Sequence, residues 1–505
     1  MKSHPYTHDF AMVFCPRWGV HAPWTAPAYL LEPVRANGFS AQFLDYNIRL
    51  YWSTMVPELW NSNLHHQYWM TQPLDYFLDQ IDLREIDARV VGFSLTETNI
   101  RFSIELARRI RKMDPNKTIL FGGHRIFFDE DPEEQVPLDV CDAIVKGEGE
   151  LTLLDILQNG LNKNIGTYTP EGDRWASNGE RELIKDLDRF PWPRYDDVDW
   201  NHFPARQMTI MGSRGCIFRC AFCNDVVRAR HRYRQRSAEH IAEEMLYHKE
   251  TNDIVFTGFN DPLINADYKH LDDLCEILLK HNYDRTWMAN VAIRRNMPVE
   301  LIRKVKRAGM DVAIIGLEAG NPNVLRLMKK RFTIEDAEWF INVLHEAGIK
   351  INLNLVVGFP GETEEDFQYT MEFITKMASK VSQIISVATL NLDRSYLWDH
   401  LDEYGVVGQA EDRHISWYTK DGSNTYEVRV KRAERLINHA HSLGLTHDRF
   451  DADIERKDRV MSISTLRRRR LQGRAKHYLK KTLQRTNLLG AAQRVRLALS
   501  NLRKT

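Results

Sequence analysis

The sequence lacks several features that define common protein classes. No apolar run approaches the roughly 18 residues that cross a bilayer, and the opening stretch, MKSHPYTHDFAMVFC, lacks the basic start and apolar core of a signal peptide. Cysteine is scarce, with six in 505 residues, and Cys15, Cys141 and Cys275 show no pairing pattern that would indicate a secreted disulfide framework. With 43% apolar and 27% charged residues, the chain is expected to form two or three globular domains in a reducing cytoplasm.

Acidic residues are absent from the C-terminal end, although the formal net charge is zero. Residues 466–505 carry thirteen Lys and Arg and no Asp or Glu, with Leu, Val and Ala interleaved. Such a basic helical tail can pack on the acidic remainder of the chain, lie on an anionic membrane surface or bind RNA. Self-packing is the first expectation and membrane contact the second. Nucleic acid comes last, because no RNA-binding fold accompanies the charge.

The first domain, residues 1–160, alternates short apolar strands with amphipathic helices. We expect strands at 11–14, 41–44, 90–94, 118–121 and 143–145, and helices at 27–35 and 99–112. This alternation predicts an α/β fold with a doubly wound, Rossmann- or flavodoxin-like parallel sheet covered on both faces. Ligands of such sheets bind beyond the carboxyl ends of the strands, where the sequence has Gly122-Gly123 and the run GEGE at 147–150.

A second series of strands and helices follows a polar, turn-rich stretch. We divide the rest of the chain into a linker at 161–205, a second domain at 206–392, an accessory region at 393–465 and the basic tail at 466–505. Strands of the second domain are expected at 207–212, 253–257, 286–290, 312–316, 351–357 and 384–389. Six strand–helix units predict a partial, TIM-like (β/α)6 barrel, whose chemistry takes place at the carboxyl ends of the strands.

Three of the six cysteines lie in one loop directly after the first strand of the second domain. The stretch RGCIFRCAFCND at 214–225 places Cys216, Cys220 and Cys223 within eight positions. A structural zinc site takes four ligands, usually as two separated pairs, and no second CxxC or HxxxH lies nearby. An iron–sulfur cluster fits better than zinc, because thiolates hold such clusters and short spacings let one loop wrap a cube. With three ligands, one iron stays open to a small molecule.

The run CIFRCAFC resembles the CxxxCxΦC signature of radical S-adenosylmethionine enzymes, with Phe222 at the aromatic position. The resemblance implies a 4Fe–4S cluster whose fourth iron chelates S-adenosylmethionine, and whose electron cleaves it to a 5′-deoxyadenosyl radical. Other segments resemble motifs of the same family: FTGFNDPLIN at 256–265, IIGLEAGNPN at 314–323 and LVVGFPGE at 355–362. They make Asn260, Asp261, Glu318 and Gly358, with Phe222, candidates for binding S-adenosylmethionine.

The first domain resembles the cobalamin-binding domain that precedes the barrel in one class of these enzymes. The match rests on Ser94 and Thr96 at the third strand end, GGH at 122–124 and CDAIVKGEGELTLLDIL at 141–157. It implies that six residues contact cobalamin: Ser94, Thr96, Gly122, Gly123, Gly147 and Glu148. The stretch CPRWGVHAPW at 15–24 lacks the DxHxxG motif whose His ligates cobalt in many cobalamin proteins, so no lower cobalt ligand is assigned.

The combined resemblance implies an enzyme that uses a 4Fe–4S cluster, S-adenosylmethionine and cobalamin. We expect methylation of an unactivated carbon in a small-molecule or lipid substrate, with electrons from a donor such as flavodoxin or ferredoxin. No catalytic side chain is identified. Two alternatives stay open: a cyclase or rearrangement enzyme with the same cofactors, and a metal-containing RNA-binding protein. The expected location is the cytoplasm, with membrane contact through the tail as the second expectation for that segment.

Overall fold

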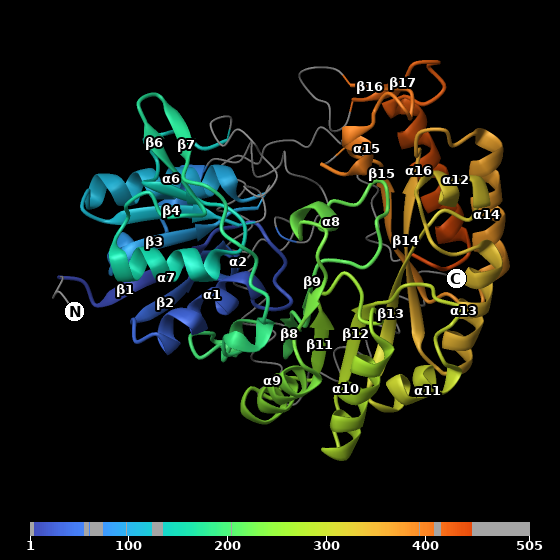
Figure 1. The fold of residues 1–505 in the computed structure, drawn as a ribbon, viewed down its shortest axis with the longest axis horizontal. Helices are drawn as coiled ribbons and strands as arrows, with labels where there is room; N and C mark the ends of the chain where they lie inside the picture. Colours follow the sequence, from blue (N-terminus) through green and yellow to red (C-terminus); the bar gives the residue numbers. More distant parts are fainter. Residues whose placement is uncertain are drawn as a thin grey trace, which may run out of the picture.

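A computed structural model describes residues 5–54, 60, 74–96, 98–123, 135–203, 205–392, 394–408 and 416–446. The chain forms two α/β domains that lie side by side, each built on a mainly parallel sheet (Figure 1). The basic tail at 466–505 and His124 fall outside the described residues. No described helix has both the length and the apolar character needed to cross a membrane.

The sheet of the first domain has seven strands in the order β2-β1-β3-β4-β5-β6-β7. Five strands pair in parallel: β1 (His8–Phe14), β2 (Ala41–Asp45), β3 (Ala88–Ser94), β4 (Thr118–Gly122) and β5 (Ala143–Val145). The order 2-1-3-4-5 is that of flavodoxin-like sheets, in which ligands bind where β1 and β3 diverge at their carboxyl ends. The predicted doubly wound domain is therefore confirmed.

Helices cover both faces of this sheet because alternate strand residues are apolar on each side. On one face α1 (Thr25–Ala36) and α7 (Gly149–Asn159) pack on Phe10, Met12 and Leu120. On the other face α6 (Ile100–Met113) packs its Phe102 and Leu106 on the sheet. Two shorter helices, α2 (Tyr46–Thr54) and α5 (Leu74–Leu78), belong to that second layer.

A β-hairpin extends the first sheet where the sequence predicted an irregular linker. Strands β6 (Thr167–Glu171) and β7 (Arg174–Ser177) pair antiparallel with each other, and β6 pairs antiparallel with β5. The predicted linker at 161–205 therefore contains a hairpin that belongs to the first sheet. Its apolar signal is short, because only two large apolar side chains, Tyr168 and Trp175, turn inward to the core of the first domain.

The second domain is a six-stranded, all-parallel open barrel in the order β15-β14-β13-β12-β11-β8. Its strands are β8 (Gln207–Ile210), β11 (Phe256–Phe259), β12 (Thr286–Asn290), β13 (Met310–Glu318), β14 (Lys350–Val357) and β15 (Gln383–Thr389). The outer helices are α9 (Ala238–Thr251), α10 (Tyr268–Lys280), α11 (Val299–Arg307), α13 (Ile334–Glu346) and α14 (Glu364–Met377). The predicted partial barrel is confirmed, with β8 and β15 at its edges among the described strands.

Short elements decorate the carboxyl ends of the barrel strands. They are β9 (Ser213–Arg214), β10 (Arg234–Gln235), α8 (Asp225–Arg228), α12 (Pro322–Leu327), α15 (Tyr396–Asp399), β16 (Val406–Val407) and β17 (Tyr418–Thr419). The accessory region adds α16 (Tyr426–Ser442), which packs on α14, β14 and β15. Three 3₁₀ turns complete the described part: Leu83–Glu85, Leu187–Arg189 and Trp200–His202.

Candidate functional site

The cysteine loop is fixed at the carboxyl end of the barrel by backbone contacts. Gly215, directly before Cys216, has φ +83°, and a Cβ there would lie 2.3 Å from the Arg232 carbonyl oxygen. Only glycine allows the chain to turn so close to its own backbone. Further along, the Ala221 amide donates to the Met328 carbonyl at 2.9 Å, and its own carbonyl accepts from the Leu397 amide at 2.7 Å. The loop is thereby held between the segments that follow β13 and β15.

The three thiols of this loop face a common cavity of about 280 Å³. All three are free of disulfides and partly buried. Burial raises the pKa of the Cys216 thiol to about 11 and that of Cys223 to about 12. A metal centre that binds them would therefore displace their protons. No three Cys, His, Asp or Glu side chains in the described ranges converge on a single ion position. The separate irons of a cluster, each taking one thiolate, need no such convergence.

A buried ion pair lies in the same cavity, which we call the cluster cavity. The Lys330 ammonium lies 3.1 Å from Glu318 Oε1 and donates to the Gly316 carbonyl at 3.0 Å. Burial opposes the charge on Lys330, but Glu318 and the cysteine sulfurs raise the pKa of the ammonium above its usual value. Glu318 ends β13 with φ +66°. Such backbone strain in a non-glycine residue is typical of functional sites.

Two of the five residues predicted to bind S-adenosylmethionine line the cluster cavity: Phe222 and Glu318. Asn260 lines the neighbouring cavity described below. Asp261 lines neither; it is 2% exposed and accepts a hydrogen bond from the Gly212 amide at 2.8 Å. Gly358 packs against the Arg429 side chain, and its amide donates to Glu362 Oε2 at 2.6 Å. The last two residues therefore position neighbouring segments of the barrel end.

Five further polar residues of this cavity were not predicted: Asp225, Asn290, Asn354, Lys330 and Arg331. Asn290 ends β12 and Asn354 lies within β14. Polar side chains at alternate positions of barrel strands, as in NLNLVV at 352–357, were the available signal. Lys330 and Arg331 follow α12, and no strand pattern marks them.

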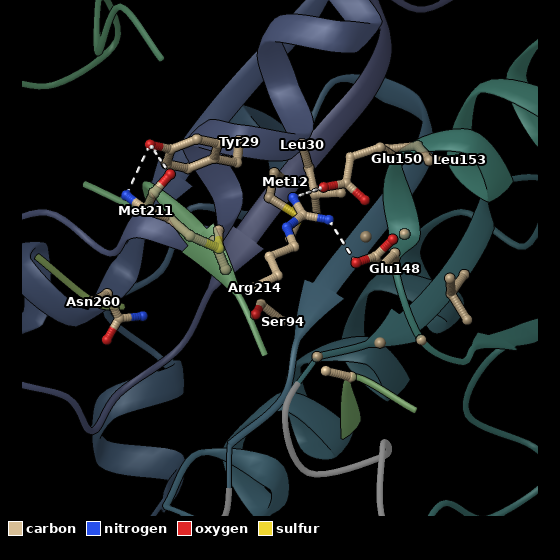
Figure 2. A pocket seen from close by; sticks show the side chains of 18 of the residues that line it. Met12, Tyr29, Leu30, Ser94, Glu148, Glu150, Leu153, Met211, Arg214 and Asn260 are labelled. Carbon is tan, nitrogen blue, oxygen red and sulfur yellow. Dashed lines mark hydrogen bonds and ion pairs between the residues drawn. The ribbon is translucent and has the colours of Figure 1, made fainter. Parts of the chain in front are cut away.

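A second cavity, of about 340 Å³, lies between the two domains; we call it the interdomain cavity. Of the six residues predicted to contact cobalamin, five line it: Ser94, Gly122, Gly123, Gly147 and Glu148. Thr96 does not. The second domain contributes Met211, Arg214 and Asn260 to the opposite wall, as Figure 2 shows.

The interdomain cavity suits a bulky ligand that carries amide groups. Its floor between α1, α7 and the sheet is apolar, with Met12, Leu30 and Leu153. At Gly123, with φ +105°, a Cβ would stand 2.7 Å from the Leu95 amide nitrogen, so only glycine fits. Glu150 Oε2 is buried, lines the cavity and accepts no hydrogen bond within the described residues. It is available to an amide donor of a ligand.

Four charged side chains tie the first domain to the cysteine loop across this cavity. Arg214, two residues before Cys216, pairs with Glu148 at 3.1 Å and also with Glu150. Glu148 binds Arg234 as well, at 2.8 Å (Figure 2 shows the Arg214 pairs). Burial opposes the charge on Arg214, but the two carboxylates raise its pKa above the usual value. The GEGE run and the cluster loop are thus held at a fixed spacing.

A second contact joins α1 to the barrel. The Met211 amide donates to the Tyr29 hydroxyl at 3.0 Å, and that hydroxyl lies 3.2 Å from the Glu244 carboxylate. Burial, together with the Glu244 charge, raises the pKa of Tyr29, so the hydroxyl stays protonated and donates to Glu244.

The cluster cavity and the interdomain cavity adjoin. Asp225, at the start of α8, and Pro262, after β11, line both of them. A ligand in the interdomain cavity therefore faces a ligand in the cluster cavity across one shared wall.

Comparisons with known proteins match the two domains separately. Residues 21–157 match the B12 binding domain, and residues 210–374 match the Radical SAM superfamily. An uncharacterized methyltransferase of Pyrococcus horikoshii, PH0819, is 26% identical over 335 residues, which cover 64% of this chain and 71% of that protein. The anaerobic magnesium-protoporphyrin IX monomethyl ester cyclase of Rubrivivax gelatinosus is 28% identical over 278 residues. That alignment covers 52% of this chain and 48% of the cyclase, about half of each.

One solved structure has a similar fold over nearly the whole chain. The radical S-adenosylmethionine methyltransferase TsrM of Kitasatospora setae, solved with cobalamin and a [4Fe-4S] cluster bound, matches with a TM-score of 0.67. The match covers 93% of this chain and 100% of TsrM at 16% identity. At that identity the match shows a shared fold only.

Proposed function

The chain belongs to the radical S-adenosylmethionine proteins that carry a B12-binding domain ahead of the barrel, and we propose that it methylates an unactivated carbon. The observation that carries this proposal is the wall shared by the two cavities at Asp225 and Pro262. Methyl transfer to a carbon radical requires hydrogen abstraction and methyl donation to reach the same carbon atom. Cavities that meet at one wall allow both.

In this proposal each cavity of the chain holds its own cofactors. Cys216, Cys220 and Cys223 would hold a 4Fe–4S cluster with S-adenosylmethionine beside it, and the interdomain cavity would hold cobalamin. When bound, the cluster and S-adenosylmethionine supply one-electron hydrogen abstraction, and cobalamin supplies methyl transfer. The residues of the chain bind these groups, orient them and exclude water.

The Glu318–Lys330 pair provides fixed polar groups in the cluster cavity. Glu318 can accept from the hydroxyl or amino groups of a nucleoside, while the ion pair with Lys330 holds its carboxylate in place. Phe222 provides an apolar wall beside the cysteines. On the other side, the pairs of Glu148 and Glu150 with Arg214 set the distance between the two cavities. This rigid spacing matches a reaction that tolerates little displacement of the reacting atoms.

The experiment that tests methylation needs no knowledge of the substrate. Anaerobically reconstituted protein is incubated with S-adenosylmethionine, cobalamin and a reductant, and nucleoside products are separated. We expect both 5′-deoxyadenosine and S-adenosylhomocysteine, because methylation consumes S-adenosylmethionine in two ways. Cys220→Ala should form no 5′-deoxyadenosine, whereas Cys275→Ala, which changes a buried cysteine of α10 outside both cavities, should form it. No nucleoside product from the unaltered protein would refute the proposal.

Cyclisation or rearrangement is the second candidate, and the similarity to the magnesium-protoporphyrin ester cyclase favours it. Both reactions would use the same two cavities. A product mixture with 5′-deoxyadenosine but without S-adenosylhomocysteine would support cyclisation and contradict methyl transfer.

A further inference from the structure

A third cavity is lined by the cysteine loop and by the segment at 322–333 that follows β13. It measures about 630 Å³, and we call it the basic cavity. Its lining includes six basic side chains and no Asp or Glu: Arg219, His231, Arg326, Lys329, Lys330 and Arg331. Neither of the cavities described above has such one-sided charge, since each contains carboxylates.

Most of these positive charges are not neutralised within the described chain. Lys330 pairs with Glu318. Arg326 bonds to the neutral amide of Asn323 at 2.9 Å, and the Lys329 ammonium lies 3.0 Å from the centre of the Tyr396 ring. Arg219 and Arg331 form no ion pair with the described residues. A concave surface with several unpaired cations concentrates the positive potential and attracts anionic partners.

The basic cavity contacts the cysteines but is separate from the interdomain cavity. Cys220 and Cys223 line both the basic cavity and the cluster cavity. The basic and interdomain cavities share no lining residue. A partner in the basic cavity therefore reaches the cysteine loop without entering the interdomain cavity.

We propose that the basic cavity is the docking surface of a small acidic one-electron donor protein. The inference rests on the proposed function, because it requires a cluster on the three cysteines. In this step the reduced donor loses one electron, the 2+ cluster gains it and becomes 1+, and no bond forms or breaks. Charge complementarity supplies recognition and fast association. The two shared cysteine side chains make the path from the docked donor to the cluster short.

The test uses a charge reversal that leaves the cofactor cavities intact. Arg326 and Lys329 line the basic cavity and neither of the others. The test variant is Arg326→Glu/Lys329→Glu in the full, anaerobically reconstituted protein. The matched control, Lys280→Glu/Arg303→Glu, reverses two exposed cations on the outer helices α10 and α11. Helix α10 ends at the amino ends of the strands, at the lower edge of Figure 1.

Binding of an acidic flavodoxin is measured by calorimetry at several salt concentrations. We expect a dissociation constant that rises with salt, and that rises roughly tenfold or more in the test variant because two attractive charges become repulsive. The control should bind as the unaltered protein does. An unchanged dissociation constant in the test variant would overturn the docking proposal.

Cleavage of S-adenosylmethionine provides a second readout. With reduced flavodoxin the rate should fall in the test variant, while with dithionite, which needs no docking surface, it should stay unchanged. If the dithionite rate also falls although iron content is normal, the cavity serves an anionic substrate and the docking proposal is wrong. Failure of the unaltered protein to cleave with dithionite would instead refute the proposed function. Should the double variant misfold, Arg326→Glu alone, on the exposed face of α12, decides the binding test.

Discussion

Replacing Glu148 by Gln perturbs the contact that joins the first domain to the cluster loop. The carboxylate lies 3.1 Å from Arg214 and 2.8 Å from Arg234, and it accepts from the Ile184 amide at 2.8 Å. Its side chain is 13% exposed. Glutamine keeps the size and part of the hydrogen bonding but removes the charge, so two largely buried guanidiniums lose their common partner.

The magnitude follows from these distances. At an effective dielectric constant near 20, each pair attracts by about 5 kcal/mol, most of which offsets the cost of burying the charges. Removing one partner of a buried pair costs about 3–5 kcal/mol, and the retained hydrogen bonds of Gln reduce this to about 3 kcal/mol. A local opening that becomes easier by about 3 kcal/mol lowers amide protection roughly 100-fold.

Hydrogen exchange at the Ile184 amide measures this opening directly. The matched control is Glu180→Gln, whose carboxylate is 57% exposed and lies 3.2 Å from Arg230. An exposed pair contributes less than about 1 kcal/mol, so Glu180→Gln should change exchange at the Ile184 amide less than about fivefold. Equal effects of Glu148→Gln and Glu180→Gln would refute the reasoning that the Glu148 contact holds the domains together.

The same carboxylate gives this contact a pH dependence. Burial acts to raise the pKa of Glu148, but Arg234 and Arg214 lower it below the usual value. A lowered folded pKa means that the stabilisation is present above the unfolded pKa, about 4.3. It is lost as the pH falls through the folded pKa. Protection at Ile184 should therefore decrease below about pH 4 in the unaltered protein, and the Gln variant should lack this decrease.

Two further predictions concern residues that shape the cavities. Gly123→Ala should lower the thermal midpoint, at a cost of about 1–3 kcal/mol, and weaken cobalamin binding, because its Cβ would meet the Leu95 backbone at 2.7 Å and φ is +105°. Gly19→Ala, with no atom within 4 Å of its Cβ, should leave the thermal midpoint and cobalamin binding unchanged. Equal thermal midpoints of the Gly123→Ala and Gly19→Ala variants would contradict the prediction. Asp261→Asn should remove a pH dependence of stability. Burial raises the pKa of Asp261 to about 6, so its protonated form stabilises the fold fully below about pH 4, and this stabilisation is lost as the pH rises through 6. Urea unfolding between pH 4 and 7 measures this. If the free energy of unfolding changed with pH by the same amount in the unaltered protein and in Asp261→Asn, the prediction would be refuted.

The sequence predicted the two folds well because their signals are local. Apolar strands bounded by glycine and polar residues gave both sheets, and the observed strand β12 at Thr286–Asn290 coincides with the expected 286–290. The hairpin of β6 and β7 escaped because only Tyr168 and Trp175 mark it, and two buried aromatic residues do not make a strand pattern.

Side-chain placement was harder to predict than the elements that carry it. Asp261 was expected to reach a ligand, yet its carboxylate turns back to the Gly212 amide. Lys330 was missed because it meets Glu318 only after the chain has formed α12 and returned. Glu148 was assigned to cobalamin from the resemblance of the stretch at 141–157, and both of its oxygens contact Arg214, Arg234 or the Ile184 amide. The contacts that Glu148 makes with residues of the second domain cannot be predicted from the sequence of the first domain alone.

The account depends most directly on three cysteines that leave one iron of a cluster open. Electron paramagnetic resonance of the anaerobically reconstituted and reduced protein, recorded with and without S-adenosylmethionine, tests this claim. We predict the signal of a reduced 4Fe–4S cluster that changes shape when S-adenosylmethionine is added, and that is lost in Cys223→Ala. A protein without a cluster signal, or with a signal indifferent to S-adenosylmethionine, would contradict the account.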